Sequence, residues 1–198
     1  MPTRVSRAAV CAIVALGAFS VWITWRAKTL EEDLGVNGTK LALVGKQAPE
    51  FHLPALDGRA VSLSDYHGRK LVVVFWASWN SRSHPAMASL GLFYRSAHTA
   101  EANFDLVAIS VGDDRKAVQD FVTQNKVTFP VLLDGAEATA KAFQVRSIPA
   151  VAVIDGNGKV TWGSAGFTQR LVFDLGRELG VTDIRGMEFG GPNGGRRN

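Results

Sequence analysis

The sequence predicts an α/β domain in which helices flank a central mixed sheet, with an apolar helix in front of it. Residues 71–76 form an uninterrupted apolar run, which is typical of a strand covered on both faces. Strand-like and helix-like segments alternate after this run, which indicates parallel strands joined by helical crossovers. A tight turn at 155–158 then indicates a hairpin, so the sheet should have an antiparallel side.

The individual elements are expected in the following order. Two short strands at 51–56 and 61–63 flank the turn Asp57-Gly58 and precede the central strand. Asp114 is suited to cap a helix that runs through Asn125 with an apolar stripe. The other expected elements are a helix at 85–96, strands at 105–111 and 129–133, a helix at 136–143, strands at 150–154 and 160–162, and a helix at 168–179.

The charge distribution argues against a nucleic-acid-binding protein. The 198-residue chain has a net charge of +4, but residues 45–185 hold 15 Lys/Arg and 14 Asp/Glu, a balance of +1. The excess lies at the two ends of the chain, for example in Arg4, Arg7, Arg196 and Arg197. Because a nucleic-acid site needs a basic face on the folded body, no nucleic-acid partner is expected.

The N-terminal segment is predicted to cross a membrane. Residues 8–25 carry no charge and would form a helix roughly 27 Å long, close to the roughly 30 Å hydrocarbon core of a bilayer. Basic residues on both sides and Trp22 and Trp25 near its end favour a signal anchor with a cytoplasmic N-terminus and an exported body. A signal peptide cleaved after 18–20 and a buried soluble helix are the alternatives, but the apolar run continues past that site.

These observations divide the chain into four parts. We expect an anchor or signal peptide at 1–27, a polar linker at 28–44, a folded domain at 45–185 and a disordered Gly/Arg tail at 186–198. The predicted location is therefore the cell membrane, with a single span and the domain on the exported side.

Several short motifs occur together in this order. They are Gly45…Ala48-Pro49-x-Phe51-x-Leu53, Asp57-Gly58, Gly68, Phe75-Trp76-Ala77-Ser78-Trp79, Ser147-Ile148-Pro149 and Asp155-Gly156-x-Gly158. Over about residues 45–182 this order resembles the thioredoxin-like superfamily, and within it the membrane-tethered redoxin or TlpA type, which is AhpC/TSA-like. The resemblance implies a thioredoxin-like fold and a family concerned with thiol redox chemistry and cell redox homeostasis.

The redox motif of that family is absent. Its two cysteine positions correspond here to Asn80 and Ser83, and the only cysteine in the chain is Cys11, in the apolar N-terminal segment. Thiol–disulfide exchange needs an attacking thiolate and a second sulfur, which an amide and a hydroxyl cannot replace. A peroxiredoxin function is excluded for the same reason. We therefore predict no catalytic residue and no cofactor, with Asn80 and Ser83 as degenerate positions of the redox motif.

A second feature of the family is kept. Pro149 corresponds to the family's cis-proline, which implies that Ile148 lies beside residues 80–83 with backbone groups able to pair with an extended peptide. The expected binding groove consists of Trp79, Ser81, Arg82, Ile148 and Pro149. Trp79 should lie at its rim, whereas Trp76 should belong to the core. A trans proline that only begins a strand is the alternative for Pro149.

Pro85 affects where the helix after the central strand begins. If Asn80 capped this helix, Pro85 would remove a hydrogen bond to the carbonyl of Ser81. If Ser83 were the cap, Pro85 would lie at the second helical position at little cost. We therefore expect a helix start near Ser83 or a kink near Pro85, and a turn that has drifted from its catalytic geometry.

Other reaction types are not supported. Ser83 and His84 are neighbours on the expected helix, where adjacent side chains diverge by roughly 100°, so they do not form a nucleophile–base pair. The histidines His52, His67, His84 and His98 are too scattered for a metal site, and none is predicted.

The main functional hypothesis is a membrane-anchored, exported domain that binds or assembles with another exported or membrane protein through the groove, without redox turnover. One alternative is a redoxin-type thiol–disulfide oxidoreductase whose partner supplies the thiol. Another alternative is a purely structural domain with a vestigial groove.

Overall fold

The main feature of the fold is a six-stranded mixed sheet with the strand order β1-β8-β7-β4-β5-β6. The strands β4 (Lys70–Trp76), β5 (Phe104–Val111) and β6 (Val131–Asp134) are parallel. β7 (Ala150–Ile154) pairs antiparallel with β4, and β8 (Val160–Ala165) pairs antiparallel with β7. The prediction of a mixed sheet with an antiparallel side is confirmed. The computed structural model describes residues 20, 39–99, 102–168 and 170–181.

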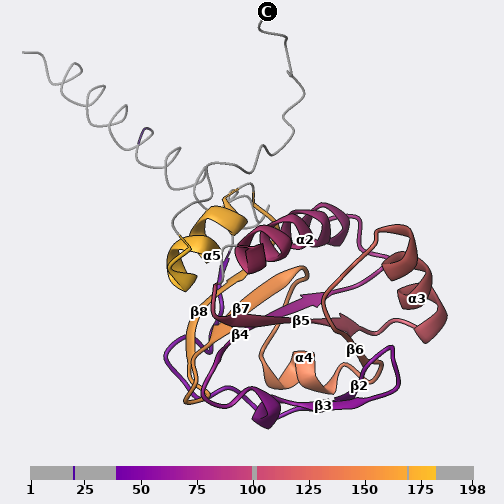
Figure 1. Cartoon of the computed structure of the whole chain (residues 1–198), viewed down its shortest axis with the longest axis horizontal. Helices are drawn as coiled ribbons and strands as arrows, with labels where there is room; N and C mark the ends of the chain where they lie inside the picture. The colour runs from indigo at the N-terminus through magenta and orange to yellow at the C-terminus, as the bar shows by residue number, and fades with distance from the viewer. Residues whose placement is uncertain (1–19, 21–38, 100–101, 169, 182–198) are drawn as a thin grey trace, which may run out of the picture.

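Both faces of the sheet are covered (Figure 1). On one face lie the helices α2 (Ser83–Thr99), α3 (Arg115–Gln124) and α5 (Leu171–Leu179). The other face is covered by α4 (Ala138–Ala142), the separate hairpin β2 (His52–Pro54)–β3 (Ala60–Ser62) and the 3-10 turn η1 (Leu63–Tyr66).

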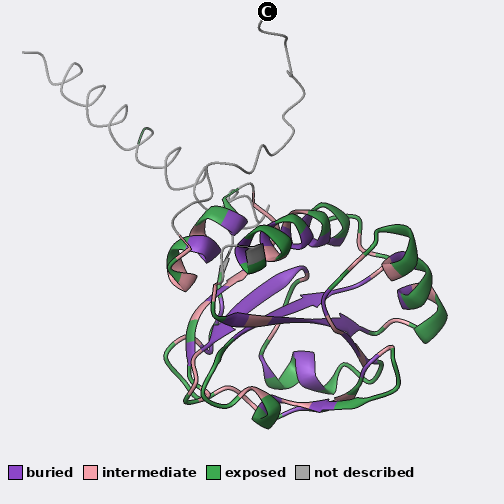
Figure 2. Cartoon of the chain, viewed as in Figure 1, coloured by how far each residue is buried: buried purple, intermediate pink, exposed green. Residues whose placement is uncertain are grey.

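The side chains of β4 divide the core into two clusters. Successive residues of a strand point to opposite faces of the sheet. Val72, Val74 and Trp76 accordingly pack in the cluster that contains α2, α3 and α5. Leu71, Val73 and Phe75 pack in the cluster that contains α4 and the β2–β3 hairpin. All six are almost fully buried, and Figure 2 draws the centre of the sheet mostly as buried, which explains why residues 71–76 are continuously apolar.

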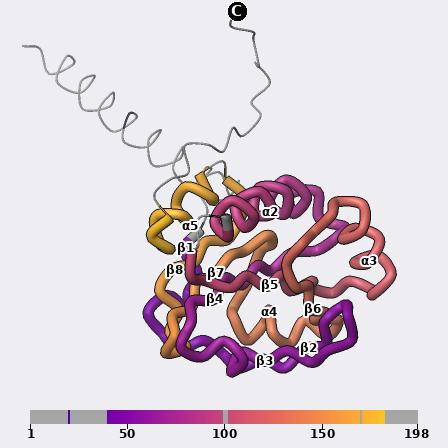
Figure 3. Tube along the Cα trace, in the orientation of Figure 1, coloured from indigo at the N-terminus to yellow at the C-terminus, as the bar shows by residue number. Residues whose placement is uncertain are grey.

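The folded domain begins earlier than residue 45. β1 (Thr39–Lys40) pairs antiparallel with β8, and the two strands lie side by side in Figure 3. Leu41 and Leu43, which follow β1, are buried in the core. Residues 39–44 therefore belong to the domain rather than to the expected linker at 28–44, because their pairing and burial hold them against the sheet.

Most predicted elements occur with shifted ends. The helix expected at 136–143 is shorter, at Ala138–Ala142, and the strand expected at 160–162 extends to Ala165, where it pairs with both β7 and β1. The predicted cap is confirmed, since Asp114 Oδ1 accepts a hydrogen bond of 2.9 Å from the N–H of Ala117. The turn at 155–158 packs closely, because a Cβ on Gly156 would lie 2.8 Å from the backbone carbon of Gly68.

Two predictions concern segments outside the described residues. The expected anchor at 8–25 is described only at Ser20, and the expected tail at 186–198 is not described. Within the part of the chain that is described, no helix combines the length and the apolar character needed to cross a bilayer.

Candidate functional site

The turn after β4 is closed by hydrogen bonds from Asn80. Its side-chain Oδ1 accepts from the N–H of Arg82 at 2.9 Å and from the N–H of Ser83 at 3.2 Å. Its backbone N–H donates to the carbonyl of Ala77 at 3.2 Å, and its carbonyl accepts from the N–H of Ser83 at 2.9 Å. These are the bonds of a helix N-cap, so the amide at the first redox position has a structural role.

Ser83, at the second redox position, is the first residue of α2 and is fully buried. Its hydroxyl oxygen accepts a hydrogen bond of 3.3 Å from the N–H of Ala77. The prediction that α2 begins near Ser83 is confirmed, but Asn80 rather than Ser83 supplies the capping oxygen. Since Ser83 Oγ is buried and bonded inside the turn, it is not presented to a substrate.

Asn80 also connects this turn to the loop before β7. Its Nδ2 lies 3.3 Å from the carbonyl oxygen of Ile148 and donates a hydrogen bond to it. The Ile148–Pro149 peptide bond is cis, and the carbonyl of Pro149 accepts a hydrogen bond of 2.7 Å from the N–H of Gly166. The turn and the loop that carry the expected groove residues are therefore joined by a hydrogen bond.

The exposure of the two tryptophans differs as the sequence predicts. Trp76 is fully buried, and its ring packs against Phe121 with centroids 4.6 Å apart. Trp79 is 67% exposed, although a large apolar side chain in water is unfavourable. Ser81 and Arg82 are also exposed, whereas Ile148 is partly buried and Pro149 is buried. Trp79, Ser81 and Arg82 are thus accessible to solvent, whereas Ile148 and Pro149 are less exposed.

Sequence reasoning missed two residues that hold this turn. The carboxylate of Asp113 accepts hydrogen bonds from the N–H and the hydroxyl of Ser78, at 2.7 and 2.8 Å. His84 Nε2 lies 2.7 Å from the carbonyl oxygen of Ser78, and because a carbonyl only accepts, Nε2 must be the donor. Asp113 precedes Asp114, the N-cap of α3, and does not itself cap that helix. Nothing in the local sequence links Asp113 to Ser78.

The geometry gives no support to hydrolysis or metal binding. His84 contacts the Ser78 carbonyl and the ring of Phe121, at a centroid distance of 5.0 Å, and it does not bond to the hydroxyl of Ser83. No group of three or more His, Cys, Asp or Glu side chains within the described residues could hold a metal ion.

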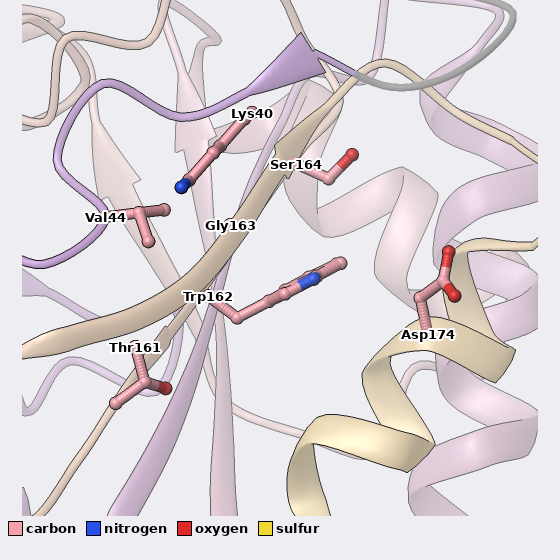
Figure 4. A pocket seen from close by; sticks show the side chains of 7 residues that line it. All are labelled: Lys40, Val44, Thr161, Trp162, Gly163, Ser164 and Asp174. Atoms are coloured by element: carbon pink, nitrogen blue, oxygen red, sulfur yellow. The ribbon is translucent and has the colours of Figure 1, made fainter.

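A cavity of about 330 Å³ lies between β1, β8 and α5 (Figure 4). In this view Lys40 and Asp174 stand on opposite sides of the Trp162 ring. Asp174 is already within 3.5 Å of Arg177. No residue of the turn 77–83 lines this cavity, so it is distinct from the candidate groove.

Comparison with protein families decides the classification. The model of the AhpC/TSA family matches residues 44–163, which is more than half of the chain. The chain belongs to the AhpC/TSA family. This match begins just before Gly45 and extends into β8, so it includes both the turn at 77–83 and the Ile148–Pro149 loop.

Curated proteins with a similar sequence are named thiol-disulfide oxidoreductases. The thiol-disulfide oxidoreductase ResA of Geobacillus thermodenitrificans is 32% identical over 120 residues, which are 59% of this chain and 66% of that protein. ResA of Bacillus subtilis is 30% identical over 131 residues, which are 66% of this chain and 72% of that protein. This chain therefore spans about two thirds of the length of these relatives.

Solved structures agree with the thioredoxin-like fold. A putative thiol:disulfide interchange protein DsbE from Chlorobium tepidum is 27% identical with a TM-score of 0.63, and the match covers 69% of this chain and 94% of that one. The thioredoxin domain of an oxidoreductase from Bacteroides vulgatus, 18% identical with a TM-score of 0.60 and covering 69% and 97% of the two chains, shows the fold alone. The predicted thioredoxin-like fold and family are confirmed.

Proposed function

We propose that this AhpC/TSA domain binds an extended segment of another protein between the Trp79–Ser83 turn and the Ile148–Pro149 loop, and that it performs no thiol–disulfide exchange by itself. The observation that carries this proposal is the contact between Asn80 Nδ2 and the Ile148 carbonyl, at 3.3 Å. It joins the two halves of the groove at the position where a redox member of the family would have sulfur.

The groups at this site suit peptide binding. Trp79 offers a large exposed apolar surface, and tryptophan is among the residues that contribute most to binding energy at interfaces. A carbonyl oxygen can accept two hydrogen bonds, so Ile148 could accept one from a ligand backbone in addition to the one from Asn80. An extended segment that adds beside Ile148 would use the mode of strand addition.

The relatives favour a second candidate function. Because they are named thiol-disulfide oxidoreductases, the domain could hold a cysteine-containing segment while a partner supplies the attacking thiolate. The thiolate would attack a disulfide sulfur of the held segment and displace the other sulfur as a thiolate, so the domain itself would neither gain nor lose electrons. Both candidates require the same groove, and they differ only in what is bound there.

The location proposed for this activity is the exported side of the membrane. The support for it is the uncharged stretch 8–25 with basic residues on both sides. In that location the partner would be another exported or membrane protein.

The groove is tested by selecting cysteine-free linear peptides from a displayed library against the full chain. We expect Trp79→Ala to weaken binding of a selected peptide at least tenfold, since truncating a tryptophan that is a hot spot of an interface costs about 2 kcal/mol or more. Phe173→Ala is the matched control, because Phe173 is a 55% exposed aromatic on α5. Equal binding by wild type and Trp79→Ala would refute the proposed groove.

The two candidates are separated by a rate measurement. The full chain is added to glutathione and a disulfide-containing peptide that it binds. A binding module leaves the exchange rate unchanged or lowers it by shielding the disulfide. A positioning role predicts a faster exchange that disappears in Trp79→Ala.

A further inference from the structure

Ser78 precedes the exposed Trp79, and its N–H, hydroxyl and carbonyl groups all form hydrogen bonds. Its N–H and its hydroxyl donate to the two carboxylate oxygens of Asp113, at 2.7 Å to Oδ2 and 2.8 Å to Oδ1. Its carbonyl accepts from Nε2 of His84 at 2.7 Å. The backbone on the N-terminal side of Trp79 is therefore fixed from two directions.

Asp113 is itself anchored. Its Oδ2 also accepts a hydrogen bond of 2.8 Å from the hydroxyl of Ser110, which is buried near the end of β5. Asp113 lies between β5 and α3, so its carboxylate connects the end of β5 to the turn after β4. His84 is held in turn by its contact with the ring of Phe121 on α3.

On the C-terminal side, Trp79 is followed by Asn80, whose backbone and side chain close the turn onto α2. Trp79 thus stands between two hydrogen-bonded residues while its own side chain remains exposed. In a redox protein of this fold a disulfide could tie the turn, whereas here hydrogen bonds to Asp113, His84 and Asn80 hold it. Ordering an interface segment before binding lowers the entropic cost of association.

We propose that Asp113 is the positioning residue of the groove: through Ser78 it holds the Trp79 rim in its binding conformation. This inference rests on the proposed function and assigns Asp113 a role in it. The role needs both carboxylate oxygens, because Ser78 uses one with its hydroxyl and the other with its N–H. An asparagine has one oxygen, so its NH₂ group would face either the N–H of Ser78, which cannot accept, or the hydroxyl of Ser78, which would have to reverse from donor to acceptor.

The test uses Asp113→Asn and a matched control, Asp120→Asn, in the full chain. Asp120 lies on α3 and loses the same charge, but it is ion-paired with Lys116 at an exposed position and does not contact Ser78. Two quantities are measured: affinity for the peptide selected in the library experiment, and amide hydrogen exchange of the segment 77–81 without ligand.

We expect Asp113→Asn to weaken peptide binding at least fivefold and to raise exchange at 77–81 at least tenfold, with exchange in β4 and α3 unchanged. Asp120→Asn should change neither. Unchanged exchange at 77–81 would overturn the inference, and so would an equal rise throughout the domain, which would indicate a role in global stability.

A double-mutant cycle supplies a second check. Ser78→Ala and Asp113→Asn should be non-additive in their effect on affinity, since the first change removes one of the bonds lost in the second. Additive effects would contradict the proposed link. If Trp79→Ala leaves peptide binding intact, the proposed function fails, whereas the exchange measurement still tests the link between Asp113 and the turn.

Discussion

Replacing Asn80 by alanine tests how much the side-chain amide at the first redox position contributes to stability. The change removes the oxygen that accepts from the N–H groups of Arg82 and Ser83, and also the donor to the Ile148 carbonyl. Loss of an N-cap costs about 1 kcal/mol. Loss of a hydrogen bond costs about 0.5–1.5 kcal/mol, and the 3.3 Å length of the bond to Ile148 places it at the lower end. We therefore expect a total cost of about 1.5–2 kcal/mol.

Equilibrium urea unfolding of the full chain, followed by tryptophan fluorescence, measures this cost as a shift in midpoint with an unchanged slope. Asn80→Asp separates the two contributions, because a carboxylate keeps the cap but cannot donate to Ile148. Asn80→Asp should therefore lower the free energy of unfolding by less than Asn80→Ala does. Gln119→Ala, an exposed amide on α3, is the control and should stay within about 0.5 kcal/mol of wild type. An Asn80→Ala variant as stable as wild type would refute the reasoning.

Three further predictions follow from the same contacts. The double variant Asn80→Cys with Ser83→Cys should form a reversible disulfide and acquire insulin-reductase activity, because Asn80 still lies beside the Ile148–Pro149 loop. Gly156→Ala should lower the free energy of unfolding by about 1–3 kcal/mol, since its Cβ would lie 2.8 Å from backbone. Burial raises the pKa of Tyr66 and Tyr94 above the ordinary value of 10.0. The folded state should therefore lose stability as the pH rises through 10, and absorbance at 295 nm should show both phenols ionising later than in the unfolded chain.

Each of these predictions has a control and a contrary outcome. Either single cysteine variant should remain inactive, and an inactive, fully oxidised double variant would mean that the groove geometry is not catalytic. Gly135→Ala should leave the free energy of unfolding unchanged, because no atom beyond its chain neighbours lies within 4 Å of its Cβ position. A Gly156→Ala variant as stable as Gly135→Ala would contradict the close approach. Native tyrosines that titrate at 10.0 would contradict the role of burial.

The sequence predicts the central sheet well because the pattern there is local. Residues 71–76 read as a buried strand and form β4, with alternate side chains in two cores. β1 could not be predicted in this way. It has two residues, and only its pairing with Ala165 and Ser164, far along the chain, makes it a strand. The same long-range packing buries Leu41 and Leu43, so the expected linker boundary was misplaced.

The candidate site was predictable where the family resemblance indicated which distant segments lie close together in the fold. That Asn80 would meet Ile148 followed from the resemblance to thioredoxin-like proteins, and not from spacing. Neither the resemblance nor the local sequence indicated the hydrogen bond between Asp113 and Ser78. Asp113 and Asp114 are adjacent and identical in type, yet one bonds across the site while the other caps α3. Only the three-dimensional structure distinguishes their roles.

The most direct test of the account is whether the groove binds a peptide when no cysteine thiol takes part. The affinity of the full chain for a selected cysteine-free peptide is measured before and after alkylation of Cys11 by iodoacetamide. We predict the same dissociation constant in both states, and at least a tenfold larger one for Trp79→Ala. Binding that disappears on alkylation, or that survives Trp79→Ala unchanged, would contradict the account.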